Sequence, residues 1–155
     1  MAATVRVQVQ AGDFDVAALQ RALLFDDAGA VVTFTGYVRK GVEGEPAVTA
    51  IELEHYPGMT EHSIEVIARE AVERWSLKGV SVVHRIGHLP VGAQIVWVGA
   101  SATHRGDAFA GCEFVMDYLK TRAPFWKKEY GDFGERWVCA RDSDEARAAR
   151  WQAEN

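Results

Sequence analysis

The chain has 155 residues, 48% of them apolar and 25% charged, which is typical of one soluble globular domain spanning residues 1–155. Its formal net charge of -5 argues against a general nucleic-acid-binding protein, which usually carries a basic face. Two cysteines, no apolar run long enough to cross a bilayer and no signal-peptide pattern at the first residues indicate a cytoplasmic protein that spans no membrane.

The first third of the chain alternates between strand and helix signals. Apolar and polar residues alternate over residues 5–10, which predicts a half-buried strand. Asp13 can cap a helix that runs to about Phe25. The β-branched and aromatic residues of segment 30–38 predict a buried strand. Segment 39–46 contains glycine and proline without an apolar period and predicts a mobile loop.

The middle third continues this alternation. Residues 48–56 are predicted to form a strand, and Thr60 with Glu61 can open a helix that continues to Trp75. Two further strands are predicted over residues 80–86 and 95–100. Gly87, Pro90 and Gly92 punctuate the connection between these strands.

The last third begins with another helix. Ser101 or Thr103 can cap it, and Pro124 ends it, because the residue before a proline is driven towards extended backbone. Its apolar positions recur at helical spacing and are predicted to pack in the core: Phe109, Cys112, Val115, Met116 and Leu119. Neither Cys112 nor Cys139 has an obvious activating base, so both thiols are expected to be inert.

A β-hairpin is predicted to follow this helix. Segments 125–130 and 135–140 read as its strands, joined by a glycine-containing turn. Neighbouring side chains of a strand point to opposite faces, so Lys127 and Lys128 cannot both enter one pocket. Glu129 shares the face of Lys127 and can orient its ammonium group.

Positive charge is concentrated between residues 116 and 129. Four cations fall here with no acidic residue between them, interleaved with three aromatic side chains: Lys120, Arg122, Lys127 and Lys128, with Tyr118, Phe125 and Trp126. In an acidic protein, such a cluster predicts a site for an anion with a flat or apolar part. The alternative is a solvated helix end with its aromatic residues in the core.

The ends of the predicted helix add to this pattern. His104 and Arg105 fall in its first turn, where free backbone N–H groups already favour anions. Lys120 falls in the last turn, where a cation also complements the helix dipole, so a structural role competes with a catalytic one.

Several familiar chemistries are not indicated. The chain contains no dinucleotide-binding or phosphate-loop motif, and its five histidines lack metal-ligand spacing, so neither a cofactor nor a metal is expected. His84 and His88 fit polar edge positions as well as ligand positions. What remains is a set of cations suited to binding phosphate and stabilising developing negative charge: Arg39, His104, Arg105, Lys120 and Lys127, with Arg141 as an additional anion contact.

Five segments together resemble one family. They are F-T-G-Y-V-R (34–39), L-E-H-Y-P-G-M-T (53–60), H-R-I-G (84–87), H-R (104–105) and M-D-Y-L-K-T-R-A-P-F-W-K (116–127). The chain resembles the large, catalytic subunit of molybdopterin synthase from about residue 30 to residue 151. The resemblance implies an α+β protein with an α/β-hammerhead fold and an additional antiparallel sheet or hairpin subdomain. It also implies a sulfurtransferase of molybdenum cofactor biosynthesis, which converts cyclic pyranopterin monophosphate into molybdopterin and builds its dithiolene.

The resemblance also implies partners. These are a second copy of the chain and a small ubiquitin-like sulfur carrier that ends in a Gly-Gly thiocarboxylate, in a 2+2 heterotetramer. The carrier tail is expected to thread a channel between hairpin 125–140 and the helix end at Lys120. Apolar contact is expected from Phe125 and Trp126, and charge from Arg122, Lys127 or Arg141.

The site residues carried over from the family fall into two groups. Lys120 and Lys127 match its catalytic lysines. Its substrate-binding positions match Tyr37, Val38, Arg39, His104, Arg105, Lys120, Lys127, Lys128 and Glu129. A competing interpretation is a non-catalytic anion-binding or carrier-docking module, in which the same cations only hold a ligand.

Overall fold

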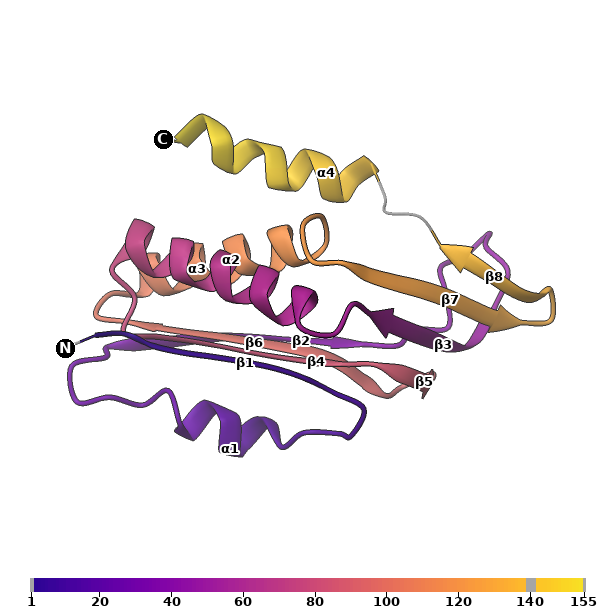
Figure 1. The fold of residues 1–155 in the computed structure, drawn as a ribbon, viewed down its shortest axis with the longest axis horizontal. Coiled ribbons are helices and arrows are strands. Elements are labelled where there is room, and N and C mark those ends of the chain that lie inside the picture. Colours follow the sequence, from indigo (N-terminus) through magenta and orange to yellow (C-terminus); the bar gives the residue numbers. More distant parts are fainter. Residues whose placement is uncertain (1, 139–141, 155) are drawn as a thin grey trace.

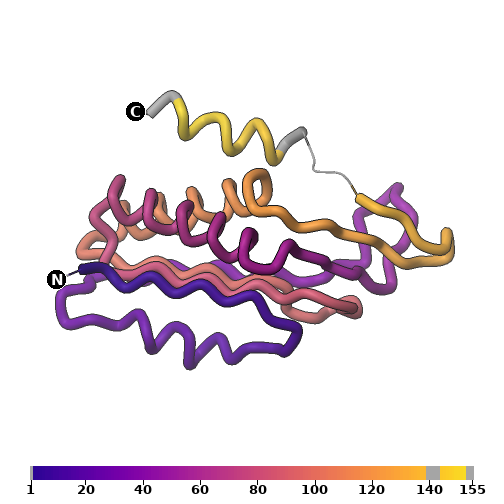
Figure 2. The backbone as a smooth tube through the Cα atoms, in the orientation of Figure 1, coloured from indigo at the N-terminus to yellow at the C-terminus, as the bar shows by residue number. Residues whose placement is uncertain are grey.

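The computed structural model describes residues 2–138 and 142–154. The elements in chain order are β1 (Thr4–Gln10), α1 (Val16–Arg21), β2 (Ala30–Tyr37), β3 (Val48–His55), α2 (Met59–Trp75), β4 (Gly79–Arg85), β5 (Gly87–Pro90), β6 (Gln94–Ala102), α3 (Arg105–Leu119), β7 (Phe125–Gly131), β8 (Gly134–Val138), α4 (Asp142–Ala149) and the 3₁₀ helix η1 (Arg150–Glu154). The start of β1 lies at one end of the molecule and the β7–β8 hairpin at the other (Figure 2).

The strands form two four-stranded sheets. Sheet A has the order β1-β4-β6-β2, in which β1 and β4 are parallel and the other pairs antiparallel. Sheet B has the order β5-β3-β7-β8 and is antiparallel throughout. The expected α+β class with an additional antiparallel sheet is confirmed.

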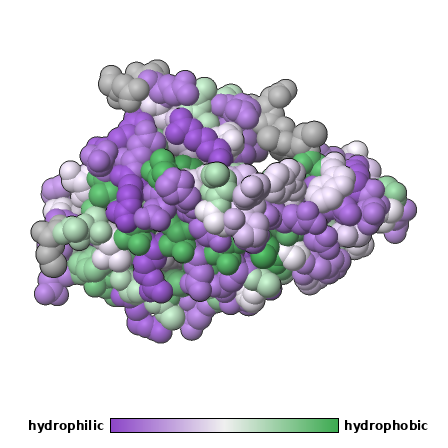
Figure 3. All heavy atoms as spheres, in the orientation of Figure 1, coloured by the Kyte–Doolittle hydropathy of each residue, from purple (hydrophilic) through white to green (hydrophobic). Residues whose placement is uncertain are grey.

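The helices are arranged in layers on sheet A. Helices α2 and α3 cover one face of the sheet, α1 lies on the opposite face, and α4 lies outside α2 and α3 (Figure 1). The main core fills the space between sheet A and α2/α3 and includes fully buried Ile64, Val82, Val98, Phe114 and Val115. Hydrophilic residues cover much of the visible helical face, with apolar residues in a band between the helices and the sheet (Figure 3).

A second, smaller core supports sheet B and the start of the loop after β2. It consists of Val38, Val48, Ile51, Leu53 and Leu89. Among the described residues, no helix is long and apolar enough to cross a membrane.

The first helix differs from its prediction. Asp15, not Asp13, caps α1, because its Oδ1 accepts hydrogen bonds from the N–H groups of Ala17 and Ala18 at 3.0 and 3.3 Å. The carboxylate of Asp13 instead accepts from Gln94. The helix ends at Arg21, since Leu23 leaves the helical path to bury its side chain to 2% exposure.

Two strands also differ from the predictions. β2 was expected to be buried, but it is an edge strand of sheet A, and Phe34 and Tyr37 remain 42% and 55% exposed. No strand was predicted between β4 and β6, but this connection contains β5, which pairs with β3. The sequence pattern predicted the remaining elements to within a few residues: strands β1, β3, β4, β6 and β7 and helix α2.

Both ends of α3 lie away from the predicted residues. His104 is the N-cap, whereas Ser101 is fully buried within β6 and Thr103 donates to the carbonyl oxygen of Asp27. The helix ends at Leu119, before Pro124, because the N–H groups of Thr121 and Arg122 both turn back to the carbonyl oxygen of Tyr118.

The C-terminal segment is fixed to the helical layer by Trp151. This side chain is 6% exposed and packs edge-on against Trp75 and Phe114, with ring centroids 5.4 and 5.7 Å away. Its Nε1 donates to Asp117 Oδ2 at 2.8 Å, and its carbonyl oxygen accepts from Arg74 Nη2 at 3.1 Å. These contacts make η1 part of the main core.

Candidate active site

A cavity of about 610 Å³ lies where the end of α3 meets sheet B. Its walls come from the end of β2 and the following loop, from β3, β7 and the ends of β4 and α3. A cavity of this size suits a small-molecule ligand. A smaller hollow of about 340 Å³ beside β1 is lined by valines with Arg6, Glu61 and Glu65, so it has no comparable concentration of positive charge.

Three of the predicted cations line the large cavity. Arg39 comes from the loop after β2, Lys120 from the end of α3 and Lys127 from β7. Arg39 and Lys120 are exposed, whereas Lys127 is half-buried. Arg39 is distant in the sequence from the two lysines, yet the fold brings all three positive charges to one cavity, as an anion site requires.

The segment that carries the lysines is attached to the start of α2. Thr60, which is fully buried, donates from Oγ1 to the carbonyl oxygen of Pro124 at 2.9 Å. The same Oγ1 accepts from the N–H of Tyr56 at 2.9 Å. Lys120 is the C-cap of α3, where its charge also complements the helix dipole. Hydrogen bonding thus holds the turn between Lys120 and β7 in place.

Lys127 and Lys128 point to opposite faces of β7, as predicted. Lys127 lines the cavity. Lys128 lies on the other face, where its Nζ is 3.6 Å from Glu135 Oε1 and 4.7 Å from the ring centroid of Trp137. Trp126 lies on that outer face too and is 48% exposed. The structure therefore brings neither Lys128 nor Trp126 into the cavity.

Glu129 shares the cavity face with Lys127, but the hydrogen-bond partner of Glu129 was not predicted. Its Oε1 accepts from Nε and Nη2 of Arg136 at 3.2 and 3.0 Å, so the carboxylate is engaged by the neighbouring strand rather than by Lys127. This pairing compensates the negative charge of Glu129 within the site. Glu45 and Asp144 also line the cavity.

Tyr37 and Val38 have different surroundings although they are adjacent. Tyr37 lines the cavity and is 55% exposed. Val38 is 3% exposed and bonded through its backbone on both sides, with N–H donating to Ala93 and the carbonyl oxygen accepting from Gly92. Val38 therefore anchors the chain just before Arg39.

His104 and Arg105 lie outside the cavity of their own chain. They begin α3, whereas Lys120 follows its last residue, so the length of this 15-residue helix, about 22 Å, separates them. Both side chains are exposed. Arg122, expected near the carrier tail, lies 3.6 Å from Glu70 and packs over the ring of Tyr118. Arg141 and Cys139 lie outside the described residues.

His84 was not selected from the sequence as a site residue, yet it lines the cavity. It is 9% exposed, and its ring stacks on Phe125 with centroids 3.9 Å apart. The H-R-I-G motif includes this position, but a sequence motif alone does not show which way a side chain points. Burial is the main reason that the pKa of His84 falls to about 4.

Cys112 has the inert character expected of it. Its side chain is buried, its Sγ lies 3.7 Å from the carbonyl oxygen of Val98, and burial raises the pKa of the thiol to about 12. Over residues 2–138 and 142–154, no three His, Cys, Asp or Glu side chains are arranged to hold a metal ion.

Comparison with known proteins establishes the family. The family model described as MoaE protein matches residues 9–122. The chain belongs to the MoaE family. A MoaE relative from Vibrio cholerae, named molybdopterin synthase catalytic subunit, is 55% identical over 148 residues, which cover 95% of this chain and 98% of the relative.

Solved structures agree with this assignment. The molybdopterin biosynthesis MoaE protein from Burkholderia ambifaria is 53% identical with a TM-score of 0.80, covering 97% of this chain and 99% of that chain. A chain from the protein–protein complex of subunits 1 and 2 of molybdopterin-converting factor from Helicobacter pylori shares the fold at 18% identity and a TM-score of 0.69, over 88% of this chain and 91% of that chain. The family resemblance seen in the sequence motifs is confirmed, and with it the expected fold and enzyme class.

Proposed function

We propose that this MoaE-family protein is the catalytic subunit of a molybdopterin synthase and transfers sulfur in molybdenum cofactor biosynthesis. Its substrate is cyclic pyranopterin monophosphate, and its product is molybdopterin, whose dithiolene holds two transferred sulfurs. The observation that best supports this function is the cavity that joins Arg39, Lys120 and Lys127. The free thiol of Cys112 fits a reducing compartment, so the proposal places the enzyme in the cytoplasm.

The three cations suit the charges of this reaction. The planar guanidinium of Arg39 can bind phosphate oxygens through two parallel hydrogen bonds. A lysine can stabilise the charge that appears when the cyclic phosphate opens, and it can also donate or accept a proton. We assign these roles to Lys120 and Lys127, because both line the cavity.

The sulfur nucleophile comes from outside this chain. Cys112 cannot supply it, because it is buried and its pKa of about 12 keeps it a thiol at neutral pH. A thiocarboxylate at the Gly-Gly end of a small carrier supplies the sulfur instead. The Helicobacter pylori neighbour, a complex of two subunits of molybdopterin-converting factor, supports a partner of this kind.

A second copy of the chain completes the assembly. His104 and Arg105 are exposed at the far end of α3 from Lys120, so they can bind the same substrate as Lys120 only if another copy presents them. This separation supports a homodimer. We propose that the working enzyme contains two copies of each subunit.

The function is tested by reconstitution. Purified protein is mixed with cyclic pyranopterin monophosphate and thiocarboxylated carrier, and the dithiolene product is measured. Carrier with an ordinary C-terminal carboxylate serves as the control and yields no product. Binding of both ligands without any product would instead favour a non-catalytic anion-binding or carrier-docking module.

A further inference from the structure

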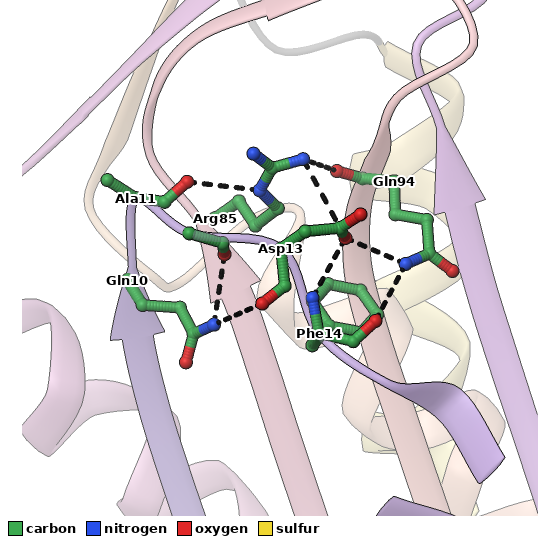
Figure 4. Close-up of polar contacts among 7 residues, drawn as sticks. Gln10, Ala11, Asp13, Phe14, Arg85 and Gln94 are labelled. Carbon is green, nitrogen blue, oxygen red and sulfur yellow. Dashed lines mark hydrogen bonds and ion pairs between the residues drawn. The ribbon is translucent and has the colours of Figure 1, made fainter. Parts of the chain in front are cut away.

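Arg85 belongs to the H-R-I-G motif but has no role in the function proposed above. It is the last residue of β4, its side chain is 15% exposed, and it lies outside the residues that line the cavity. Its Nε donates to the carbonyl oxygen of Ala11 at 3.1 Å, and its Nη1 donates to that of Gln94 at 3.2 Å (Figure 4). One guanidinium group therefore joins the loop after β1 to the first residue of β6.

The side chain of Gln94 joins the same two segments a second time. Its Nε2 donates to Asp13 Oδ1 at 2.8 Å and to the carbonyl oxygen of Phe14 at 3.0 Å. Asp13 Oδ1 also lies 3.8 Å from Nη1 of Arg85, so the two charges oppose each other beside Gln94 (Figure 4). The first residue of β6 is thus bonded through its backbone and through its side chain.

The strand ladder of sheet A is interrupted where these bonds form. The register between β4 and β6 runs as far as the pair of His84 with Val96, two residues away from Gln94. The register between β2 and β6 shifts at Tyr37, which pairs with Gln94. Such a shift disrupts the regular pairing of two strands locally. The bonds of Arg85 therefore constrain the start of β6 at a place where regular pairing constrains it least.

The residues just before β6 bind the backbone that leads to Arg39. The N–H of Val38 donates to the carbonyl oxygen of Ala93 at 2.9 Å, and the carbonyl oxygen of Val38 accepts from the N–H of Gly92 at 2.8 Å. The residue that follows Val38 is Arg39, which lines the cavity. A continuous path of peptide bonds and hydrogen bonds therefore leads from the guanidinium group at the end of β4 to the backbone of Arg39.

We propose that Arg85 is a positioning residue for Arg39, which it directs to the cavity by fixing the start of β6. An arginine that binds phosphate through two parallel hydrogen bonds depends on the direction of its planar guanidinium group. A displacement of about 1 Å is enough to lose such a geometry. The effect on precursor binding rests on the sulfur-transfer function proposed above, whereas the hold of Arg85 on the backbone before Arg39 does not.

The test measures precursor binding by full-length Arg85→Met protein, in which the side chain remains long but has no hydrogen-bond donor. We expect the Kd for cyclic pyranopterin monophosphate to rise by about tenfold, the effect of losing a hydrogen bond to a charged group. The KM for the precursor rises with it, whereas kcat and the Kd for the carrier stay unchanged. Arg69→Met is the matched control, since Arg69 bonds to Glu65 on α2 outside the cavity, and it leaves all four quantities unchanged.

A double-mutant cycle separates positioning from a general structural effect. If Arg85 acts through Arg39, Arg85→Met has no further effect on the precursor Kd of Arg39→Ala protein. A general loss of order would instead raise this Kd by the same factor with and without Arg39. Amide hydrogen exchange follows the backbone directly: the N–H groups of Val38 and Gly92 exchange faster in Arg85→Met than in the unmodified protein, because their hydrogen bonds open more often.

Equal effects of Arg85→Met with and without Arg39 would overturn the proposal, as would an unchanged precursor Kd or a lower kcat at unchanged KM. If Arg85→Met does not fold, Arg85→Lys replaces it, because one ammonium group lacks the planar fork that reaches both carbonyl oxygens. The same Arg39-dependent loss of affinity is then expected. If the unmodified protein binds no precursor, the proposed function fails, yet unchanged hydrogen exchange at Val38 would still overturn this inference and faster exchange would support it.

Discussion

Thr60 and Pro124 are 64 positions apart in the chain, yet the hydroxyl group of one donates to the carbonyl oxygen of the other at 2.9 Å. The bond joins two of the sequence segments that carry the family resemblance. It ties the first turn of α2 to the segment between Lys120 and Lys127. The positions of the two lysines therefore depend on a residue that does not line the cavity.

Replacing Thr60 with valine tests this dependence. The change removes the hydroxyl from a fully buried position and leaves the N–H of Tyr56 and the carbonyl oxygen of Pro124 without their partner. We expect the free energy of unfolding to fall by about 1–3 kcal/mol, measured by urea denaturation. Thr49→Val is the control, because its hydroxyl donates to Tyr130 from an exposed position. Equal losses in both proteins would contradict a special role for Thr60.

The lysines of the cavity are tested by Lys120→Ala and Lys127→Ala. Each is expected to lower sulfur transfer by roughly a hundredfold, because groups that stabilise charge or move protons contribute about that much to rate. Both variants should unfold at the same temperature as the unmodified protein. Lys128→Ala is the matched control, since Lys128 lies on the outer face and is expected to retain most activity. Near-normal turnover of either cavity variant removes that lysine from the mechanism.

Arg39 is expected to bind the precursor rather than the carrier. Arg39→Ala should therefore weaken binding of cyclic pyranopterin monophosphate more than binding of the carrier, as measured by separate calorimetric titrations. The same is expected for alanine at His104 or Arg105. Arg105→Lys should not restore binding if the contact is a paired guanidinium–phosphate interaction. Equal loss of affinity for both ligands would argue against this division of roles.

The stability of the protein should depend on pH through His84. The folded protein holds this ring neutral down to about pH 4, whereas the ring of the unfolded chain takes up a proton below about 6.5. The unfolded state therefore binds more protons in this interval, and stability rises with pH. As pH falls from 6.5 to 4, the loss reaches about 3 kcal/mol. Unfolding curves of His84→Gln should not show this loss of stability at low pH. An identical pH dependence of stability in both proteins would contradict the prediction.

The sequence pattern predicted most of the fold because the periods of the strands and of α2 are regular. The alternation of Val5, Val7 and Val9 appears in the structure as alternating burial along β1. The sequence pattern did not predict features that depend on contacts between distant segments. The apolar composition of β2 indicated burial, but composition does not reveal that a strand lies at the edge of a sheet. Asp13 was predicted to cap the first helix, but Gln94, 81 positions away, binds its carboxylate, and Asp15 caps the helix instead.

Part of the candidate site was also predicted from the sequence, and the rest depends on contacts between separate segments. Strand alternation was sufficient to separate Lys127 from Lys128. The family motifs marked Arg39 and Lys120, which the fold brings to the same cavity. No local pattern indicates that Arg136 approaches Glu129 from the adjacent strand or that His84 is buried beside Phe125, because both contacts depend on how separate segments pair and pack.

The burial of Trp151 has a consequence for the order in which the protein can fold during synthesis. Trp75 and Phe114 leave the ribosome well before Trp151, which completes their aromatic cluster. Until then these rings form an incomplete apolar surface, a feature that favours aggregation of partly folded chains. A premature stop codon just before position 151 would make that exposure permanent. Such a product would be degraded although every residue lining the cavity had been translated.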